Sequence, residues 1–190
     1  MSVKGTKTEL NLLSAFAGES QARNRYEMFA KIAKKEGYVQ ISEIFKETAR
    51  NEFEHAKRFF RFLEGGAVEI TAMYPAGIEG TTAENLKAAA EGENEEHTIL
   101  YPQAADVAKA EGFPEIAAAF RAIAKVELAH ETRYLKLLEN IETNKVFKRE
   151  NKVIWKCNVC GYLHEGFEPP MVCPSCKHPQ EHFFIKEENY

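Results

Sequence analysis

The chain has 190 residues, which allows one domain with a full hydrophobic core and a small second domain. Its net charge of -4 gives no reason to expect nucleic acid or an anionic membrane as a partner. No apolar run approaches the ~20 residues of a membrane span, and residues 1–6 lack the apolar segment of a signal peptide. We therefore expect a cytoplasmic protein that binds neither nucleic acid nor membrane.

Apolar periodicity and turn signals predict four helices between residues 6 and 142. Two of them begin at Thr-x-x-Glu capping patterns, at Thr6 and Thr81, and three end at Glu-Gly pairs. The expected ranges are 6–36, 39–64, 81–111 and 114–142. A short, a long and a short connection join them, which is the order of a ferritin-like four-helix bundle with one long crossover. The predicted fold is therefore mainly α.

The two halves of this region repeat each other at an offset of 75 residues, so that Tyr26 corresponds to Tyr101. Glu19 corresponds to Glu93, but at an offset of 74. One extra residue inside a helix indicates a π-bulge, a feature that often lies at functional sites.

Two Glu-x-x-His motifs, Glu52 to His55 and Glu127 to His130, place a carboxylate and an imidazole on one face of each of two helices. Glu19 and Glu93 lie on the apolar stripes of the other two helices. Buried carboxylates cost several kcal/mol each without cations, so a metal-free polar core is the weaker alternative. The combination is the known pattern of di-iron and di-manganese carboxylate sites in ferritin-like bundles.

Glu96 lies three residues after Glu93 and therefore on the same face, whereas its counterpart in the first half is Ala22. It is either a peripheral glutamate or a further ligand. An oxygen-rich set of ligands suits iron or manganese better than copper. Three other acidic or histidine residues lie near these ligands in the sequence, and we expect them either on the surface or in contact with the ligands without binding the metal: Glu54, Glu95 and His97.

The four cysteines form two Cys-x-x-Cys pairs, Cys157 with Cys160 and Cys173 with Cys176. Four thiolates at this spacing indicate a tetrahedral site for zinc or for a single iron, and a structural zinc ribbon is the alternative to a redox site. Residues 155–190 are too few to bury a sufficient core without a metal. We expect domains at 1–145 and 155–190, joined by a charged linker at 146–154. Three histidines are not needed as ligands: His164, His178 and His182. Several aromatic residues are available to shield the metal from water: Trp155, Tyr162, Phe167, Phe183 and Phe184.

With both sites placed, the chain resembles the rubrerythrins over nearly its whole length. Residues 15–26, AFAGESQARNRY, are similar to the first-helix signature of that family, and a bundle followed by a rubredoxin-like domain is the order of its long form. The resemblance implies two irons in the carboxylate site and one iron in the four-cysteine site, with zinc as a substitute there. It also implies a role for each residue. Glu52 and Glu127 would bridge the two irons, Glu19 would be a terminal ligand of the first iron, and Glu93 and His130 would be terminal ligands of the second. Glu96 and His55 would exchange as ligands of the first iron when its oxidation state changes, and Tyr26 and Tyr101 would donate hydrogen bonds to ligands.

The activity implied by the resemblance is peroxide reduction by a non-haem di-iron peroxidase that protects against oxidative stress. Electrons would come from a rubredoxin or a reductase that uses NADH, through the iron of the four-cysteine site, and the subunits would form a head-to-tail homodimer. The chain has no Gly-x-Gly-x-x-Gly motif, so the nicotinamide cofactor is expected to bind the reductase. One alternative is a ferroxidase or iron-handling ferritin-like protein, although such a protein does not need an electron-transfer site in the same chain. The other is a non-catalytic module whose four cysteines hold a structural zinc.

Overall fold

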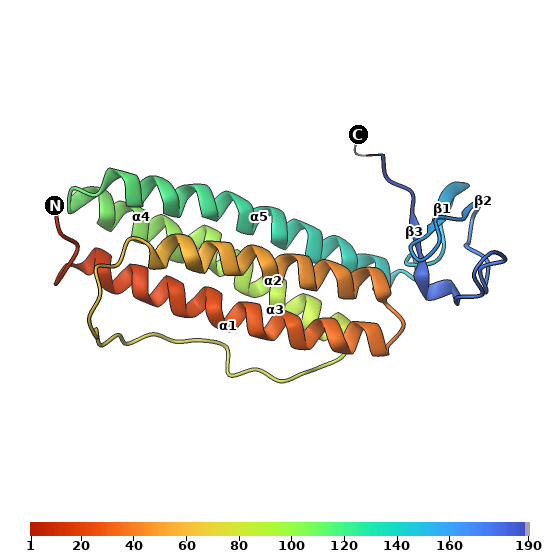
Figure 1. The fold of residues 1–190 in the computed structure, drawn as a ribbon, viewed down its shortest axis with the longest axis horizontal. Coiled ribbons are helices and arrows are strands. Elements are labelled where there is room, and N and C mark those ends of the chain that lie inside the picture. The colour runs from red at the N-terminus through yellow and green to blue at the C-terminus, as the bar shows by residue number, and fades with distance from the viewer. Residues whose placement is uncertain (189–190) are drawn as a thin grey trace.

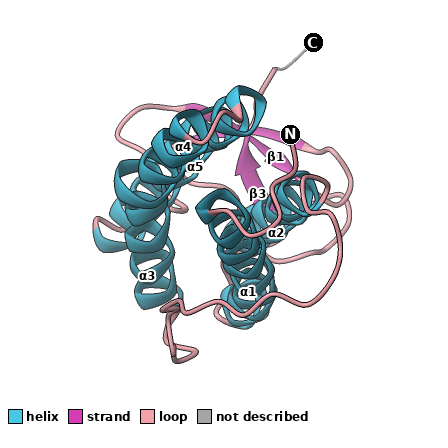
Figure 2. Ribbon diagram, turned by 90° about the vertical axis from the view of Figure 1, so that its left-hand side faces the viewer, coloured by secondary structure: helices cyan, strands magenta, loops and turns pink. Residues whose placement is uncertain are grey.

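The computed structural model describes residues 1–188, which form a long helical bundle and a small β-containing tail (Figure 1). Helices α1 (Lys7–Lys35) and α2 (Val39–Phe60) form one antiparallel pair. The second pair joins α5 (Pro114–Glu142) to a nearly continuous helix made of α3 (Thr82–Glu95), the π-helix η1 (Glu96–Leu100) and α4 (Tyr101–Ala110). Figure 2 shows the two pairs lying side by side, which confirms the mainly α four-helix prediction.

Polar groups at the helix ends explain why these helices begin and end where they do. The Thr81 hydroxyl accepts from Glu84 N, and the Glu84 carboxylate accepts from Thr81 N, which completes the predicted capping box. At α1 only half of the box forms, because the Glu9 carboxylate accepts from Gly5 N at 2.7 Å instead of from the capping residue. Gly37, after α1, has a φ of 84°, a left-handed conformation that glycine adopts without strain.

Helix α2 ends at Phe60, so the prediction that it continues to Glu64 was wrong. The chain tightens here into i to i+3 hydrogen bonds, from Phe62 N to Phe59 O and from Leu63 N to Phe60 O, both at 3.1 Å. This turn packs Phe62 and Leu63 against the core.

The π-helix confirms the extra residue inferred from the two offsets. Tyr101 N donates to Glu96 O, five residues earlier, in place of the usual four. In a regular α-helix, Leu100 would face the core with Glu93, seven residues earlier, but it is 45% exposed because the extra residue turns it away from the core.

Two apolar clusters fill the bundle, one toward each end, and the buried glutamates lie between them. The first contains Phe59, Tyr101 and Phe120, and the second contains Tyr26, Phe45 and Tyr134. The site is therefore enclosed by aromatic side chains along the bundle axis.

The tail is a three-stranded antiparallel sheet with the order β2-β1-β3, in which β1 spans Val153–Cys157, β2 spans Leu163–Gly166 and β3 spans Phe183–Ile185. A short 3-10 helix, η2 (Gln180–His182), precedes β3. The tail lies beyond the end of the bundle where α1 ends and α2 begins (Figure 1). Among the described residues, no helix combines the length and the apolar character needed to cross a membrane.

Candidate metal centres

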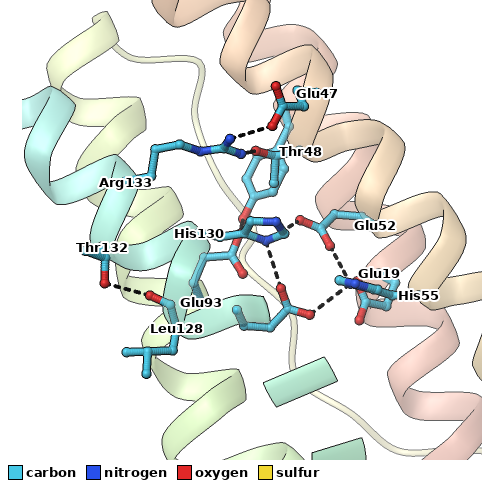
Figure 3. Close-up of polar contacts among 12 residues, drawn as sticks. Glu19, Glu47, Thr48, Glu52, His55, Glu93, Leu128, His130, Thr132 and Arg133 are labelled. Carbon is cyan, nitrogen blue, oxygen red and sulfur yellow. Dashed lines mark hydrogen bonds and ion pairs between the residues drawn. The ribbon is translucent and has the colours of Figure 1, made fainter. Parts of the chain in front are cut away.

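Glu52 and Glu127 lie at the centre of the carboxylate site, and each reaches both imidazoles. Figure 3 shows Glu52 between His55 and His130. The two Glu52 oxygens are 3.0 Å from His55 Nδ1 and 3.3 Å from His130 Nδ1. The two Glu127 oxygens are 2.9 Å from His55 Nδ1 and 2.8 Å from His130 Nδ1. Both carboxylates therefore span the space between the two histidines.

The ligand atoms form two sets that share these carboxylates. In each set, the atoms offered by its residues lie within 4.8 Å of one another. Glu19 Oε2 is 3.7 Å from His55 Nδ1, and Glu93 Oε1 is 3.8 Å from His130 Nδ1. The two sets are Glu19, Glu52, His55 and Glu127, and Glu52, Glu93, Glu127 and His130.

The two tyrosines make the hydrogen bonds expected of them. Tyr26 Oη donates to Glu93 Oε1 at 2.6 Å, and Tyr101 Oη donates to Glu19 Oε1 at 2.5 Å. Both hydroxyls are buried, and each occupies one oxygen of a carboxylate that belongs to a single set. The other oxygen of each carboxylate is left without a hydrogen bond.

Burial and neighbouring charges shift the pKa values of several residues in the cluster. Burial raises the pKa of Glu93 to about 8 and that of Glu19 well above its usual range. Burial alone would also raise the pKa of Glu52, but the neighbouring imidazoles of His130 and His55 lower it to about 2. Burial would lower the pKa of His130, but the carboxylates of Glu127 and Glu52 outweigh it and raise the value to about 12. Without cations, the cluster therefore compensates its negative charge by retaining protons.

The residues present fit two metal ions. Several ligand atoms are buried and have no well-aligned hydrogen bond, although the Glu127 oxygens lie close to the imidazoles. A buried polar group that is left entirely unpaired costs about 1–3 kcal/mol. Carboxylate oxygens with two imidazoles are the donors that iron or manganese prefers. The atoms without a well-aligned hydrogen bond are Glu19 Oε2, Glu52 Oε1, Glu93 Oε2, both oxygens of Glu127, and His130 Nδ1.

Glu96 stands beside the two sets but belongs to neither of them. It is half-buried at the start of the π-helix, and one of its oxygens is 4.0 Å from the position that a Cβ would take on Gly18. Burial, with the negative charges of Glu19 and Glu93, raises the pKa of its carboxyl group. The sequence placed Glu96 near the site, and the structure places it at the edge.

The four cysteines meet in the tail, with Sγ atoms 3.7 Å apart between Cys157 and Cys176 and between Cys160 and Cys173. Each pair lies in a turn whose first cysteine carbonyl accepts a backbone hydrogen bond, from Gly161 N at 2.8 Å or from Lys177 N at 2.9 Å. The backbone N–H of Tyr162 lowers the pKa of the Cys160 thiol to about 6, which favours the thiolate that a metal binds.

Two aromatic residues cover the cysteines, fewer than the sequence suggested. Trp155 and Phe183 are buried with Cys157 and Cys173, and Tyr162 packs on them in part. Phe167 is 49% exposed and does not cover the site. Among the described residues, the cysteine cluster groups the four cysteines with none of the three tail histidines.

The family models match both parts of the chain. The model described as Rubrerythrin matches residues 11–138, and the model described as Rubrerythrin, rubredoxin-like domain matches residues 155–184. The chain belongs to the rubrerythrin family. The rubrerythrin of Porphyromonas gingivalis is 60% identical to it, over 100% of this chain and 94% of the relative. The rubrerythrin of Nitratidesulfovibrio vulgaris is 55% identical, over 100% of this chain and 99% of the relative.

Solved structures agree with this membership. Fully reduced, all-ferrous nigerythrin is 29% identical, with a TM-score of 0.62, and the match covers 97% of this chain and 92% of that one. Reduced symerythrin from Cyanophora paradoxa is 25% identical, with a TM-score of 0.63, over 75% of this chain and 89% of that one. As a rubrerythrin-family protein, the chain has a di-iron carboxylate site in its ferritin-like bundle and a rubredoxin-like metal site at its four cysteines.

A second layer of residues surrounds this rubrerythrin-family site, and the sequence had singled out only His97 among them. His97 Nε2 lies 2.6 Å from Glu131 Oε2, which ties the π-helix to α5. Arg133 donates to the Thr48 hydroxyl at 2.7 Å and links α5 to α2 (Figure 3). Tyr134 is fully buried, and its hydroxyl has no hydrogen-bond partner. Tyr134 also had a usable signal, because it lies seven residues after Glu127 and therefore on the same helix face.

Proposed function

We propose that this protein is a peroxidase that reduces hydrogen peroxide to water and thereby protects the cell from oxidative stress. The supporting observation is that one chain holds two metal-binding clusters of different chemistry, a buried carboxylate cluster and a cluster of four thiols. A carboxylate cluster alone suits several functions, since a fold does not fix a reaction. The thiol cluster adds a one-electron relay, which a peroxidase needs and an iron store does not.

The contacts suggest a role for each ligand. Glu52 and Glu127 would bridge the two irons, because each lies within 3.3 Å of both imidazoles. Two ferrous irons held there would supply one electron each, and with two protons these two electrons reduce one hydrogen peroxide to two waters. The remaining ligands divide between the irons: Glu19 and His55 on the first, Glu93 and His130 on the second.

The tyrosines would orient the terminal carboxylates. Tyr101 holds Glu19 by Oε1, and Tyr26 holds Glu93 by Oε1, so in both residues Oε2 is the free oxygen. This arrangement directs one defined oxygen of each terminal carboxylate to the metal. The hydroxyls also limit rotation of the carboxylates when the charge of the site changes.

Glu96 and His55 would exchange as ligands of the first iron. Glu96 is half-buried and outside both ligand sets, whereas His55 lies within 3.0 Å of Glu52. The π-helix favours such a movement, because its backbone geometry leaves Glu96 out of the regular α-helical register.

The position of the tail supports a head-to-tail homodimer. Glu52 lies thirteen residues into α2, roughly 20 Å along the axis from the helix end near the tail. Electron transfer slows steeply with distance, so the tail of a partner subunit that lies alongside the bundle is the better donor. An external reductase drawing on NADH, or a rubredoxin, would reduce the thiolate iron. A reducing cytoplasm would keep these four cysteines available for the metal.

Cys173→Ser tests the relay, because it removes one buried thiolate of the cluster. We expect turnover of peroxide with a reductase to be lost, while chemically reduced protein still reacts once with peroxide. Val159→Ala is the matched control, since this exposed residue lies in the other cysteine turn and offers no ligand. Undiminished turnover with a reductase would contradict the relay, and loss of the single turnover would show that the tail takes part in the di-iron chemistry itself.

A further inference from the structure

The long crossover between α2 and α3 lies across the outside of the bundle. It leaves the end of α2 near the N-terminus and runs along α1 to the start of α3 (Figures 1 and 2). Residues 67–80 have no helix or strand, and most of them are exposed. A segment that only connected two helices would not need to contact the bundle along its way.

A cavity of about 300 Å³ lies between this crossover and the helices. Residues 71–75 of the crossover form one side of it, and Gly18 of α1 forms part of the other. Glu96 and Tyr101 also line the cavity, and Tyr101 donates to the Glu19 carboxylate. The cavity therefore ends at Tyr101 and Glu96, beside Glu19, and its lining includes none of the residues of the two ligand sets.

Three residues meet where this cavity approaches the site. The Tyr74 hydroxyl donates to Ser14 O at 2.7 Å, which fixes the crossover to α1. Tyr74 Cε1 lies 3.6 Å from the position that a Cβ would take on Gly18, and Glu96 Oε1 lies 4.0 Å from the same position. A hydrogen atom at Gly18 thus leaves space that a branched side chain would fill.

We propose that this cavity is the route by which peroxide reaches the di-iron site, and that Tyr74 and Gly18 set the size of the molecules admitted. The route deepens the proposed peroxidase function and rests on it for the identity of the substrate. Hydrogen peroxide would pass between the Tyr74 ring and Gly18 to Glu96, whereas bulky organic hydroperoxides would be retarded at this point. Tyr74 and Gly18 would act on specificity and not on the chemical step.

The first test uses azide, a small anion whose binding to the diferric protein is followed by its charge-transfer absorption and needs no turnover. Gly18→Val should slow azide binding at least tenfold, because two methyl groups would enter the space between Tyr74 and Glu96. Tyr74→Ala should speed it several-fold. Tyr38→Ala is the control, since this tyrosine lies at the far end of α1, outside the cavity. Iron content and helical circular dichroism should match the wild type in every variant.

The second test compares substrates. Tyr74→Ala should lower the ratio of kcat/KM for hydrogen peroxide to kcat/KM for cumene hydroperoxide at least tenfold, while Tyr38→Ala leaves this ratio unchanged. Azide rates within twofold of the wild type in both Gly18→Val and Tyr74→Ala would overturn the route. If azide rates respond but the wild type does not turn over peroxide, the route stands and the peroxidase proposal fails.

Discussion

Removing the metal ions should make the bundle lose stability as the pH rises from about 5 to about 9. In the metal-free protein, burial raises the pKa of Glu93 to about 8, against an ordinary value of 4.5. A carboxyl group with a raised pKa keeps a proton that the unfolded chain has already released. Its stabilising contribution is complete below the unfolded pKa and is lost as the pH rises through the folded pKa.

His130 acts in the same direction at higher pH. Burial opposes its protonation, but Glu127 and Glu52 raise its pKa to about 12, against an ordinary value of 6.5. Its contribution is complete below the ordinary value and declines as the pH rises toward 12. Glu52 has the opposite sign, because its pKa is lowered to about 2, and its effect is confined to the acid side of 4.5.

The size of the effect follows from linkage, since one excess bound proton changes the free energy of unfolding by about 1.4 kcal/mol per pH unit. Glu93 then accounts for about 3 kcal/mol between pH 5 and 7, and His130 for a similar loss between pH 7 and 9. The sum, on the order of 6 kcal/mol, is comparable with the roughly 5–15 kcal/mol that stabilises a typical domain. Bound metals replace these protons, so the iron-loaded protein should vary much less.

The assay is urea unfolding at a series of pH values, followed by far-ultraviolet circular dichroism, which reports the bundle because its long helices dominate the signal. Chelator-treated and iron-loaded samples are compared at equal ionic strength. A chelated protein whose stability is constant or rises from about pH 5 to about pH 9 would refute the reasoning.

Two substitutions test the surroundings of the metals. Glu96→Ala should leave both irons bound, because Glu96 is outside the two ligand sets, but it should slow peroxide turnover. Metal analysis and steady-state kinetics check the two outcomes, and unchanged turnover would remove Glu96 from the mechanism. Tyr101→Phe should lower the free energy of unfolding of the iron-loaded protein by about 2 kcal/mol, since it removes a buried hydrogen bond to the Glu19 carboxylate. Urea unfolding measures the loss, Tyr38→Phe serves as its control, and equal losses in the two variants would contradict the role of the hydrogen bond.

The sequence predicted the centre of the site well because helical periodicity fixes which side chains share a face. Glu52 with His55, and Glu127 with His130, each lie three residues apart, so a helix brings them together whatever the details of packing. The π-helix could be inferred because the two halves of the bundle repeat each other, so that comparing them revealed one extra residue in the second half.

The edge of the site could not be predicted in the same way. Tyr74 lies in a crossover without periodicity, and its bond to Ser14 joins segments 60 residues apart. The contact of Arg133 with Thr48 depends on how two helices pack, which neither local sequence specifies. Leu100 is exposed because it lies in the π-helix, where the α-helical period of 3.6 residues does not hold.

The most direct test of the peroxidase proposal is stopped-flow absorption of anaerobically reduced protein mixed with hydrogen peroxide or with oxygen. The return of the ferric tetrathiolate colour reports oxidation of the iron held by the four cysteines. We predict a fast return with peroxide and a slow return with oxygen. A faster return with oxygen would contradict the proposal and favour a ferroxidase, and a protein without this colour would contradict the electron relay, because its tail would hold zinc.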